Sequence, residues 1–353
     1  MKAAPVVAAL RDQGVPQRLI HTGQHYDAAM SDVFFRDLGL PEPDLNLGVG
    51  SGTQAGQTGA TMVALEAAFD DIRPALVMVY GDVNSTLAAS LVAAKSRLPL
   101  AHVEAGLRSF DPAMPEEVNR RVTDLLSDLL FTTSPEATDH LLAMGVPQGS
   151  IHFVGNPMID TLLAHLDRFD VAAATAAVGI SSPYLVATIH RPSNVDDLVA
   201  AGRIAAMLDA LSERAPVVVP LHPRGRATLA AAGLRASARL HLVDPMGYVE
   251  FLSLVRGAVA VVTDSGGIQE ETTVLRVPCL TVRRNTERPI TISHGTNQLV
   301  EPEDVPARLD AILAGEVDFP EATPPLWDGH AGERIASIVA RSLTADGRVA
   351  TAG

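Results

Sequence analysis

The sequence predicts two α/β domains, each a doubly wound parallel sheet with helices on both faces. Three observations lead to this prediction. The chain has 353 residues, and at roughly 150 residues per domain this length favours two domains. Short apolar segments alternate with alanine-rich stretches of helical length along the chain. Most of the short segments are apolar at every position, which is typical of strands that helices cover on both sides.

Ten strands are expected, five in each half of the chain. They lie at residues 18–22, 75–80, 100–104, 129–132 and 151–154, and then at 184–189, 217–221, 239–243, 258–263 and 279–282. The main helices are expected at residues 1–10, 54–70, 84–97, 162–179, 196–213, 267–276 and 332–343. Gly179, Ser181, Ser182 and Pro183 interrupt the pattern before a new strand. We therefore expect an N-terminal domain at 1–162, a C-terminal domain at 163–335 and a final helix and tail at 336–353.

The amino-acid composition excludes several classes of function. Hydrophobic residues make up 47% of the chain, enough for two full cores. The net charge of −14 argues against nucleic acid as the main ligand, and no apolar run is long enough to span a membrane. The single cysteine, Cys279, excludes a disulfide framework and a cysteine-based metal site. The apolar opening meets Arg11 and Asp12 at once, so we expect no signal peptide and a cytoplasmic protein.

A glycine-rich turn follows the strand at 258–263. Ser265, Gly266 and Gly267 stand between this strand and the next helix, where bare backbone N–H groups and the helix dipole favour a phosphate. Glu271 lies four residues after Gly267 on the same helical stripe and suits a pair of ribose hydroxyls. The alternative is a helix whose first-turn acidic residues only complement the dipole, which leaves the paired glycines unexplained.

Charged side chains also follow two strands of the first half. Glu104 closes a buried strand and Arg108 lies in the loop after it, so the pair is either functional or a structural ion pair. Asp82 follows the preceding strand, where a turn or capping role is the local alternative.

The segment MPEEVNRR at 114–121 opens a helix with Pro115 at its start. Glu116 and Arg120 are four residues apart, and so are Glu117 and Arg121. Taken alone, this spacing predicts two surface ion pairs of a few tenths of a kcal/mol each.

Two histidine–arginine pairs end successive strands of the second half. His190 and Arg191 follow the strand at 184–189, and His222 and Arg224 follow the strand at 217–221. Histidine exchanges protons near neutral pH and arginine neutralises phosphate, so this recurrence favours a functional edge of the sheet.

Together these segments resemble the non-hydrolysing UDP-N-acetylglucosamine 2-epimerase family. The matching stretches occur in the family's order: HTGQHYD (21–27), YGDVNSTLA (80–88), HVEAGLRSFDPAMPEEVNR (102–120), GNPMID (155–160), TIHRPSNVDD (188–197), PLHPRGR (220–226), TDSGGIQEE (263–271) and NTERP (285–289). The combination of HVEAGLRS, PEEVNR and TDSGGIQEE is highly specific.

The resemblance implies two Rossmann-like domains facing a cleft, as in B-type glycosyltransferases, with the last helix crossing back to the first domain and a homodimeric assembly. It implies reversible inversion at C2 of UDP-GlcNAc to give UDP-ManNAc, through elimination of UDP and its re-addition, with no metal and no cofactor. Asp82, Glu104 and Glu116 then match the family's acid/base carboxylates, and His190 its catalytic histidine. The UDP-sugar is expected on Lys2, Arg108, His222, Arg224, Ser265, Gly266, Gly267, Glu271 and Arg288.

Three features depart from the family pattern. A central first strand and a GTRPE loop normally precede the helix that matches residues 1–10, and this sequence lacks both. We expect the natural start to lie upstream of Met1. Ser193 stands where many members carry a glutamate, which bears on substrate contacts, and QHYD replaces a QHR form found in members with an activator site.

Other functions stay open at this point. The substrate is UDP-GlcNAc or a modified UDP-HexNAc such as a diacetamido uronic acid nucleotide. A retaining glycosyltransferase of the same fold is a different enzyme class, against which the acidic motifs of the first domain argue. Without the N-terminal loop, a UDP-sugar-binding protein that has lost activity is the third possibility.

Overall fold

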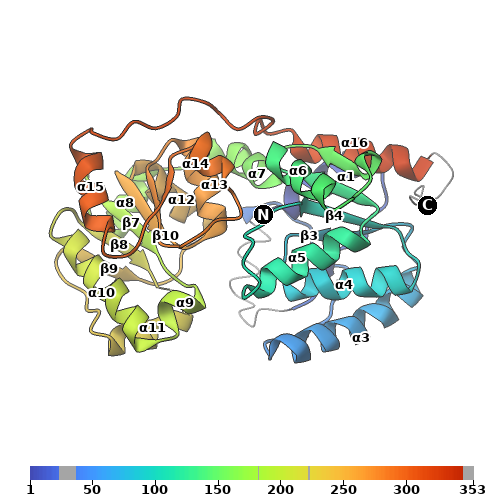
Figure 1. The fold of residues 1–353 in the computed structure, drawn as a ribbon, viewed down its shortest axis with the longest axis horizontal. Helices are drawn as coiled ribbons and strands as arrows, with labels where there is room; N and C mark the ends of the chain where they lie inside the picture. The colour runs from blue at the N-terminus through green and yellow to red at the C-terminus, as the bar shows by residue number, and fades with distance from the viewer. Residues whose placement is uncertain (24–36, 182, 222, 345–353) are drawn as a thin grey trace. The chain divides into compact units, whose positions relative to one another are not determined.

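The computed structural model describes residues 1–23, 37–181, 183–221 and 223–344, without the side chains of Pro223 and Arg224. The chain divides into two compact α/β units (Figure 1). Unit 1 comprises Met1–Ala164 and Pro325–Gly353, and unit 2 comprises His165–Pro324. None of the helices described is long and apolar enough to cross a membrane.

Unit 2 contains one six-stranded parallel sheet in the order β12-β11-β10-β7-β8-β9. If these six strands are numbered 1 to 6 along the chain, their order across the sheet, starting from β9, is 3-2-1-4-5-6. This is the strand order of the dinucleotide-binding fold. The central strand β7 pairs with β10 on one side and with β8 on the other. The four residues of β10 that pair with β7 are apolar or threonine. The strands are β7 Leu185–Thr188, β8 Val217–Pro220, β9 Leu240–Val243, β10 Ala260–Thr263, β11 Cys279–Thr281 and β12 Asn297–Leu299.

The helices of unit 2 bury their apolar stripes against this sheet. One core cluster joins α10 residues such as Leu208 and Leu211 to strand residues such as Leu185 and Val219. The helices are α8 Val171–Val178, α9 Pro192–Val195, α10 Leu198–Ser212, α11 Pro223–Ala231, α12 Tyr248–Gly257, α13 Gly266–Leu275, α14 Ile290–Ser293 and α15 Val305–Leu313, with a 3-10 turn at Leu166–Arg168.

The strands of unit 1 form two separate parallel sheets within the described residues. One has four strands in the order β3-β4-β5-β6, and the other pairs β1 with β2. In the larger sheet β4 is buried at every position, as expected of a strand covered on both faces. The strands are β1 Ile20–His21, β2 Leu45–Asn46, β3 Val77–Tyr80, β4 Leu100–Ala105, β5 Leu129–Thr132 and β6 Ile151–Phe153.

Two layers of helices enclose the larger sheet of unit 1. Helices α3 and α4 pack on one cluster, which contains Leu65 and Val92, while α1 and α16 share another, which contains Val6 and Ile335. Helices α1 and α16 therefore pack together (Figure 1). The helices are α1 Ala3–Asp12, α3 Gln54–Ile72, α4 Asn84–Lys95, α5 Pro115–Leu126, α6 Pro135–Ala143, α7 Pro157–His165 and α16 Ala331–Thr344, with a 3-10 turn at Gln148–Ser150.

The chain rejoins unit 1 at Pro325, whereas the sequence places the second boundary at residue 335. The difference arises because the segment before α16 already belongs to unit 1. The indole N–H of Trp327 donates to the Thr133 carbonyl at 2.9 Å, and the Asp160 carboxylate accepts from the Gly332 N–H at 2.7 Å. Gly155 has φ +86°, and a Cβ there would lie 2.0 Å from the Leu326 carbonyl oxygen.

All ten predicted strands are present, most of them shortened by one or two residues. Strands β2 and β12 were not predicted, because two or three residues carry no periodicity. The single helix predicted at 162–179 is wrong. It is broken into α7, a 3-10 turn and α8, since Phe169 is buried and the Asp170 side chain starts α8 by accepting from the Ala173 N–H.

We predict that Gly155→Ala strongly destabilises unit 1, whereas Gly145→Ala costs only about 1 kcal/mol. Both glycines have left-handed backbone, φ +86° and +82°, but a Cβ on Gly145 meets nothing within 4 Å. The collision at Gly155 adds an overpacking cost of about 3 kcal/mol. Urea unfolding followed by fluorescence of Trp327, the chain's single tryptophan, measures both. Equal midpoints for the two variants would contradict the prediction.

Candidate active site

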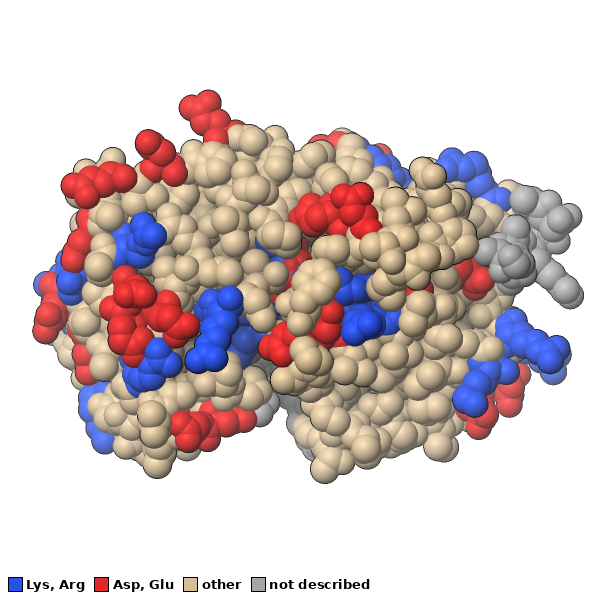
Figure 2. Space-filling model, in the orientation of Figure 1, with Lys and Arg blue, Asp and Glu red and all other residues tan. Residues whose placement is uncertain are grey.

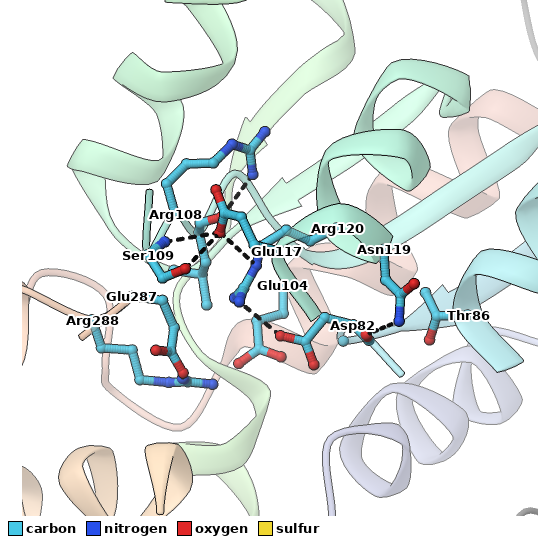
Figure 3. Close-up of polar contacts among 12 residues, drawn as sticks. Asp82, Thr86, Glu104, Arg108, Ser109, Glu117, Asn119, Arg120, Glu287 and Arg288 are labelled. Carbon is cyan, nitrogen blue, oxygen red and sulfur yellow. Dashed lines mark hydrogen bonds and ion pairs between the residues drawn. The ribbon is translucent and has the colours of Figure 1, made fainter. Parts of the chain in front are cut away.

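Three ionisable side chains meet at the carboxyl ends of β3 and β4 in unit 1. Glu104, whose side chain is 3% exposed, is held by the ammonium group of Lys2 at the start of α1. Asp82 follows β3 and keeps 24% of its side chain exposed. Figure 3 shows the carboxyl groups of Asp82 and Glu104 on the same side of the sheet edge. The carboxyl ends of parallel strands are where ligands bind in such sheets.

The backbone at Glu104 is strained. Glu104 has φ +76°, which a side chain rarely adopts, and the pairing of β4 with β5 slips between Val103 and Ala105. A bulge at a strand end re-aims one side chain, and left-handed non-glycine residues cluster at functional sites. Gly81 makes room for it, since a Cβ there would lie 3.1 Å from the Lys2 ammonium nitrogen and 3.3 Å from a Glu104 oxygen.

Arg120 is buried between two carboxylates and is not part of a surface pair. Its Nη1 lies 3.0 Å from Asp82 Oδ2 and its Nε lies 3.1 Å from Glu117 Oε2 (Figure 3). The surface pairs that spacing alone suggested are therefore wrong, because α5 turns Arg120 into the interior, where it is 2% exposed. The neighbouring Asn119 donates to the Asp82 carbonyl at 2.9 Å, so consecutive α5 residues hold both the main chain and the side chain of Asp82.

The two adjacent glutamates of α5 have different environments. Glu117 is buried, and its Oε2 accepts from the N–H and the hydroxyl of Ser109 at 2.9 and 3.0 Å as well as facing Arg120. Glu116 is half-buried in the first turn of α5. The sequence predicts Glu116, not Glu117, as an acid/base residue. Among the described residues, Glu117 has hydrogen-bond and ion-pair partners, whereas no such contact is seen for Glu116.

Arg108 lies in a buried network behind this site. Its guanidinium is 2.6 Å from Asp124 Oδ2, and Asp124 Oδ1 lies 2.7 Å from Nδ1 of His102. The other ring nitrogen of His102 is 2.9 Å from the Gly81 carbonyl. All three side chains are buried, so the observed contacts of Arg108 are those of a residue that supports the loops.

In unit 2 the glycine-rich turn opens α13 as predicted. Ser265 is the residue before the first turn, and Gly266 and Gly267 begin the helix. A Cβ on Gly266 would lie 2.4 Å from Nη1 of Arg288. A helix N-terminus with a guanidinium beside it is an electropositive site that suits a phosphate.

Arg288 is part of a buried charge cluster. Its Nε lies 2.9 Å from Glu270 Oε1, its Nη1 contacts Glu287, and Glu287 in turn accepts from Arg283 at 2.6 Å. Burial opposes ionisation of Glu287, but the guanidinium groups of Arg288 and Arg283 outweigh it and hold its pKa far below the usual range. Glu270 thus faces Arg288, while the adjacent Glu271 takes another direction.

Glu271 is an acid of unit 2 whose pKa is strongly raised. Burial raises its pKa to about 8, and the neighbouring Glu270 adds to the shift. A hydrogen bond with the buried hydroxyl of Tyr248 opposes this rise in the pKa of Glu271. A buried carboxyl beside a buried hydroxyl offers hydrogen-bonding groups to a ligand that brings hydroxyls of its own.

His190 follows β7 and presents a half-exposed ring, with Nδ1 3.1 Å from the buried carboxylate of Asp264. His222 and the side chain of Arg224 lie outside the described residues. Among the residues that the structure describes, no group of three or more His, Cys, Asp or Glu side chains is arranged to hold a metal ion.

Four supporting residues were not predicted: Glu117 as a buried partner, Arg120, Asp264 and Glu287. The three-residue spacing of Glu117 and Arg120 was visible in the sequence, as was the position of Asp264 directly after a strand. The four-residue spacings of Glu116 with Arg120 and of Glu117 with Arg121 predict surface pairs instead, because the sequence does not say which way α5 faces.

We predict that Glu271→Gln stabilises unit 2 increasingly as pH rises. The folded pKa of about 8 exceeds the usual value of 4.5, so the stability lent by the neutral acid is complete below about pH 4.5 and is lost as pH rises toward 8. Between pH 5.5 and 8.5 the advantage of the glutamine variant should grow by about 3 kcal/mol. Urea unfolding followed by circular dichroism at both pH values measures it. Exposed Glu316→Gln is the control, and parallel pH profiles for Glu271→Gln and wild type would contradict the assignment.

Comparison with known proteins identifies the family of the chain. The family model described as UDP-N-acetylglucosamine 2-epimerase matches residues 8–340. A UDP-N-acetylglucosamine 2-epimerase of Methanocaldococcus jannaschii is 37% identical over 351 residues, covering 96% of this chain and 95% of that protein. A UDP-2,3-diacetamido-2,3-dideoxy-D-glucuronate 2-epimerase of Pseudomonas aeruginosa is 41% identical over 301 residues, covering 83% and 82%.

A solved structure gives the same answer for the fold. The crystal structure of the Methanocaldococcus jannaschii UDP-GlcNAc 2-epimerase in complex with UDP-GlcNAc and UDP superposes with a TM-score of 0.88 at 36% identity, covering 96% of both chains. The predicted fold class and family resemblance are therefore confirmed. The chain belongs to the UDP-N-acetylglucosamine 2-epimerase family.

Proposed function

We propose that this chain interconverts UDP-GlcNAc and UDP-ManNAc. In the reaction a base removes the proton from C2 while the C1–O bond to UDP breaks, and the electrons form a C1=C2 double bond. UDP then adds back to C1 as a proton reaches C2 from the opposite face. The observation that carries the proposal is the strained, buried Glu104 beside half-exposed Asp82 at one sheet edge.

The carboxylates of unit 1 supply the proton transfers in this proposal. Inversion needs a base on one face of C2 and an acid on the other, and several carboxyl groups in different environments can divide these tasks. Asp82 is ion-paired to Arg120, Glu104 is paired to Lys2, and Glu116 is half-buried on the first turn of α5. Three carboxylates with three different surroundings support this division.

The α13 end of unit 2 holds the nucleotide in this proposal. The diphosphate lies on Ser265, Gly266 and Gly267 with Arg288 beside them, because N–H groups and a guanidinium complement its charge. Glu271 binds the ribose hydroxyls, which the position of its buried carboxyl beside the Tyr248 hydroxyl supports. His190 faces the leaving UDP.

A second substrate has a specific observation in its favour. The Pseudomonas aeruginosa relative, which acts on a diacetamido glucuronate nucleotide by its name, shares 41% identity with this chain. The same C2 chemistry serves both sugars, since the acetamido group at C2 is common to them. We keep the diacetamido uronic acid nucleotide as the alternative substrate.

We also propose a cytoplasmic homodimer that supplies surface-polysaccharide synthesis, as the family resemblance implies. Supporting the dimer, the face over α3, α4 and α5 carries few charged side chains (Figure 2). On these helices, Val63 of α3 and Val118 and Leu125 of α5 are 72%, 49% and 62% exposed. Such a face favours association with a second copy. Sedimentation of the chain at its single-chain mass of 37.1 kDa would refute the dimer.

Proton NMR of the protein with UDP-GlcNAc in deuterated water tests the activity. We expect UDP-ManNAc to form with deuterium at C2, because the C2 proton is exchanged with solvent during inversion. Glu104→Gln should lower this rate about a hundredfold to ten-thousandfold, as expected when an acid/base group is removed.

Exposed Glu316→Gln provides the matched control and should retain the wild-type rate. A parallel reaction contains the diacetamido glucuronate nucleotide. Turnover of that nucleotide alone would favour the alternative substrate. If UDP binds but neither sugar gains deuterium at C2, the chain is a UDP-sugar-binding protein and the proposed activity is wrong.

A further inference from the structure

Asp264 is the centre of a dense set of hydrogen bonds at the end of β10. Its carboxylate is fully buried and accepts from the backbone N–H groups of His190 and Arg191 at 3.1 and 2.9 Å and from the side-chain amide of Asn194 at 2.9 Å. Its carbonyl oxygen accepts from Nε of Arg191 at 2.9 Å. The loop that carries His190 is thus tied to the strand next to it.

The same carboxylate also contacts the imidazole ring. Nδ1 of His190 lies 3.1 Å from Asp264 Oδ1, while 45% of the histidine side chain stays exposed. Burial opposes ionisation of Asp264, but the bonds from His190, Arg191 and Asn194 outweigh it and hold its pKa below the usual range. An ionised carboxylate has no proton to donate, so the hydrogen between these two atoms belongs to Nδ1.

We propose that Asp264 is a positioning residue that fixes His190 with its proton on Nδ1 and thereby makes Nε2 the nitrogen that serves the nucleotide. The inference rests on the proposed function for the ligand, but the protonation pattern itself is a property of the resting protein. In water a free histidine prefers the proton on Nε2, so the contact selects the less common tautomer. A carboxylate behind Nδ1 also stabilises the imidazolium form.

Arg191 is a charged group next to this pair, since its Nε donates to the Asp264 carbonyl. Its Nη2 lies 3.8 Å from Glu287, whose carboxylate is already held by Arg283 and Arg288. These three guanidinium groups outnumber the carboxylates that they contact, Glu287 and Glu270. Asp264 is the carboxylate that the structure places on Nδ1, so its replacement should change which ring nitrogen of His190 carries the proton.

Nitrogen-15 NMR of histidine-labelled protein, with the His190 signal assigned by its loss in His190→Gln, reads the tautomer directly. At a pH where His190 is neutral we expect the proton on Nδ1 in the wild type. In Asp264→Asn the amide side chain no longer requires that proton, so a substantial fraction should move to Nε2. Asp197→Asn is the matched control. Asp197 caps α10 and contacts no histidine among the described residues, and asparagine can also cap a helix.

Kinetics give the second readout. Asp264→Asn should lower kcat about 10- to 100-fold with KM changed less than about threefold. A proton on Nε2 in the wild type would overturn the proposal even if the variant fails to fold. An unchanged tautomer and kcat in a folded Asp264→Asn would also overturn it. If the chain binds UDP but epimerises nothing, the tautomer result still decides this inference, and only the proposed activity falls.

Discussion

The candidate site of unit 1 depends on one buried arginine. Arg120 is 2% exposed and lies between the carboxylates of Asp82 and Glu117. A buried guanidinium needs such partners, because leaving it unpaired costs roughly 3–5 kcal/mol. Two carboxylates brought together without it would repel each other. The arginine therefore holds the loop after β3 and the start of α5 in one arrangement.

In unit 2 the buried groups that hold the loops are negatively charged. There a buried carboxylate, Asp264, gathers N–H donors from the loop after β7, and a second one, Glu287, gathers guanidinium groups beside the α13 N-terminus. In each unit a buried charge fixes a loop at the carboxyl end of the sheet. This explains how short loops on parallel strands can hold polar groups precisely without a metal or a disulfide among the residues described.

Much of the fold could be predicted from the sequence, because strands covered on both faces are apolar at every position and helices between them are alanine-rich. The ends of these strands also located Asp82, Glu104, His190 and the α13 turn. Periodicity could not detect β12, three residues long, or the break of the helix predicted at 162–179, where the chain passes between units. Nor could it reveal that Arg120 faces inward and Arg108 is bound to Asp124, since both depend on partners distant in the sequence. Spacing identifies candidate pairs, and only the packed structure selects the partner.

We propose a division of labour, with proton transfer at the carboxylates of unit 1 and nucleotide binding at the α13 end of unit 2. Arg120→Lys tests it most directly, because lysine keeps the charge but cannot hold two carboxylates with one planar fork. Deuterium incorporation at C2 of UDP-GlcNAc and the Kd for UDP are measured on the same preparation. The account predicts that exchange falls at least about thirtyfold while the Kd changes less than about twofold. Exchange at the wild-type rate, or a loss of UDP affinity that parallels the loss of exchange, would contradict it.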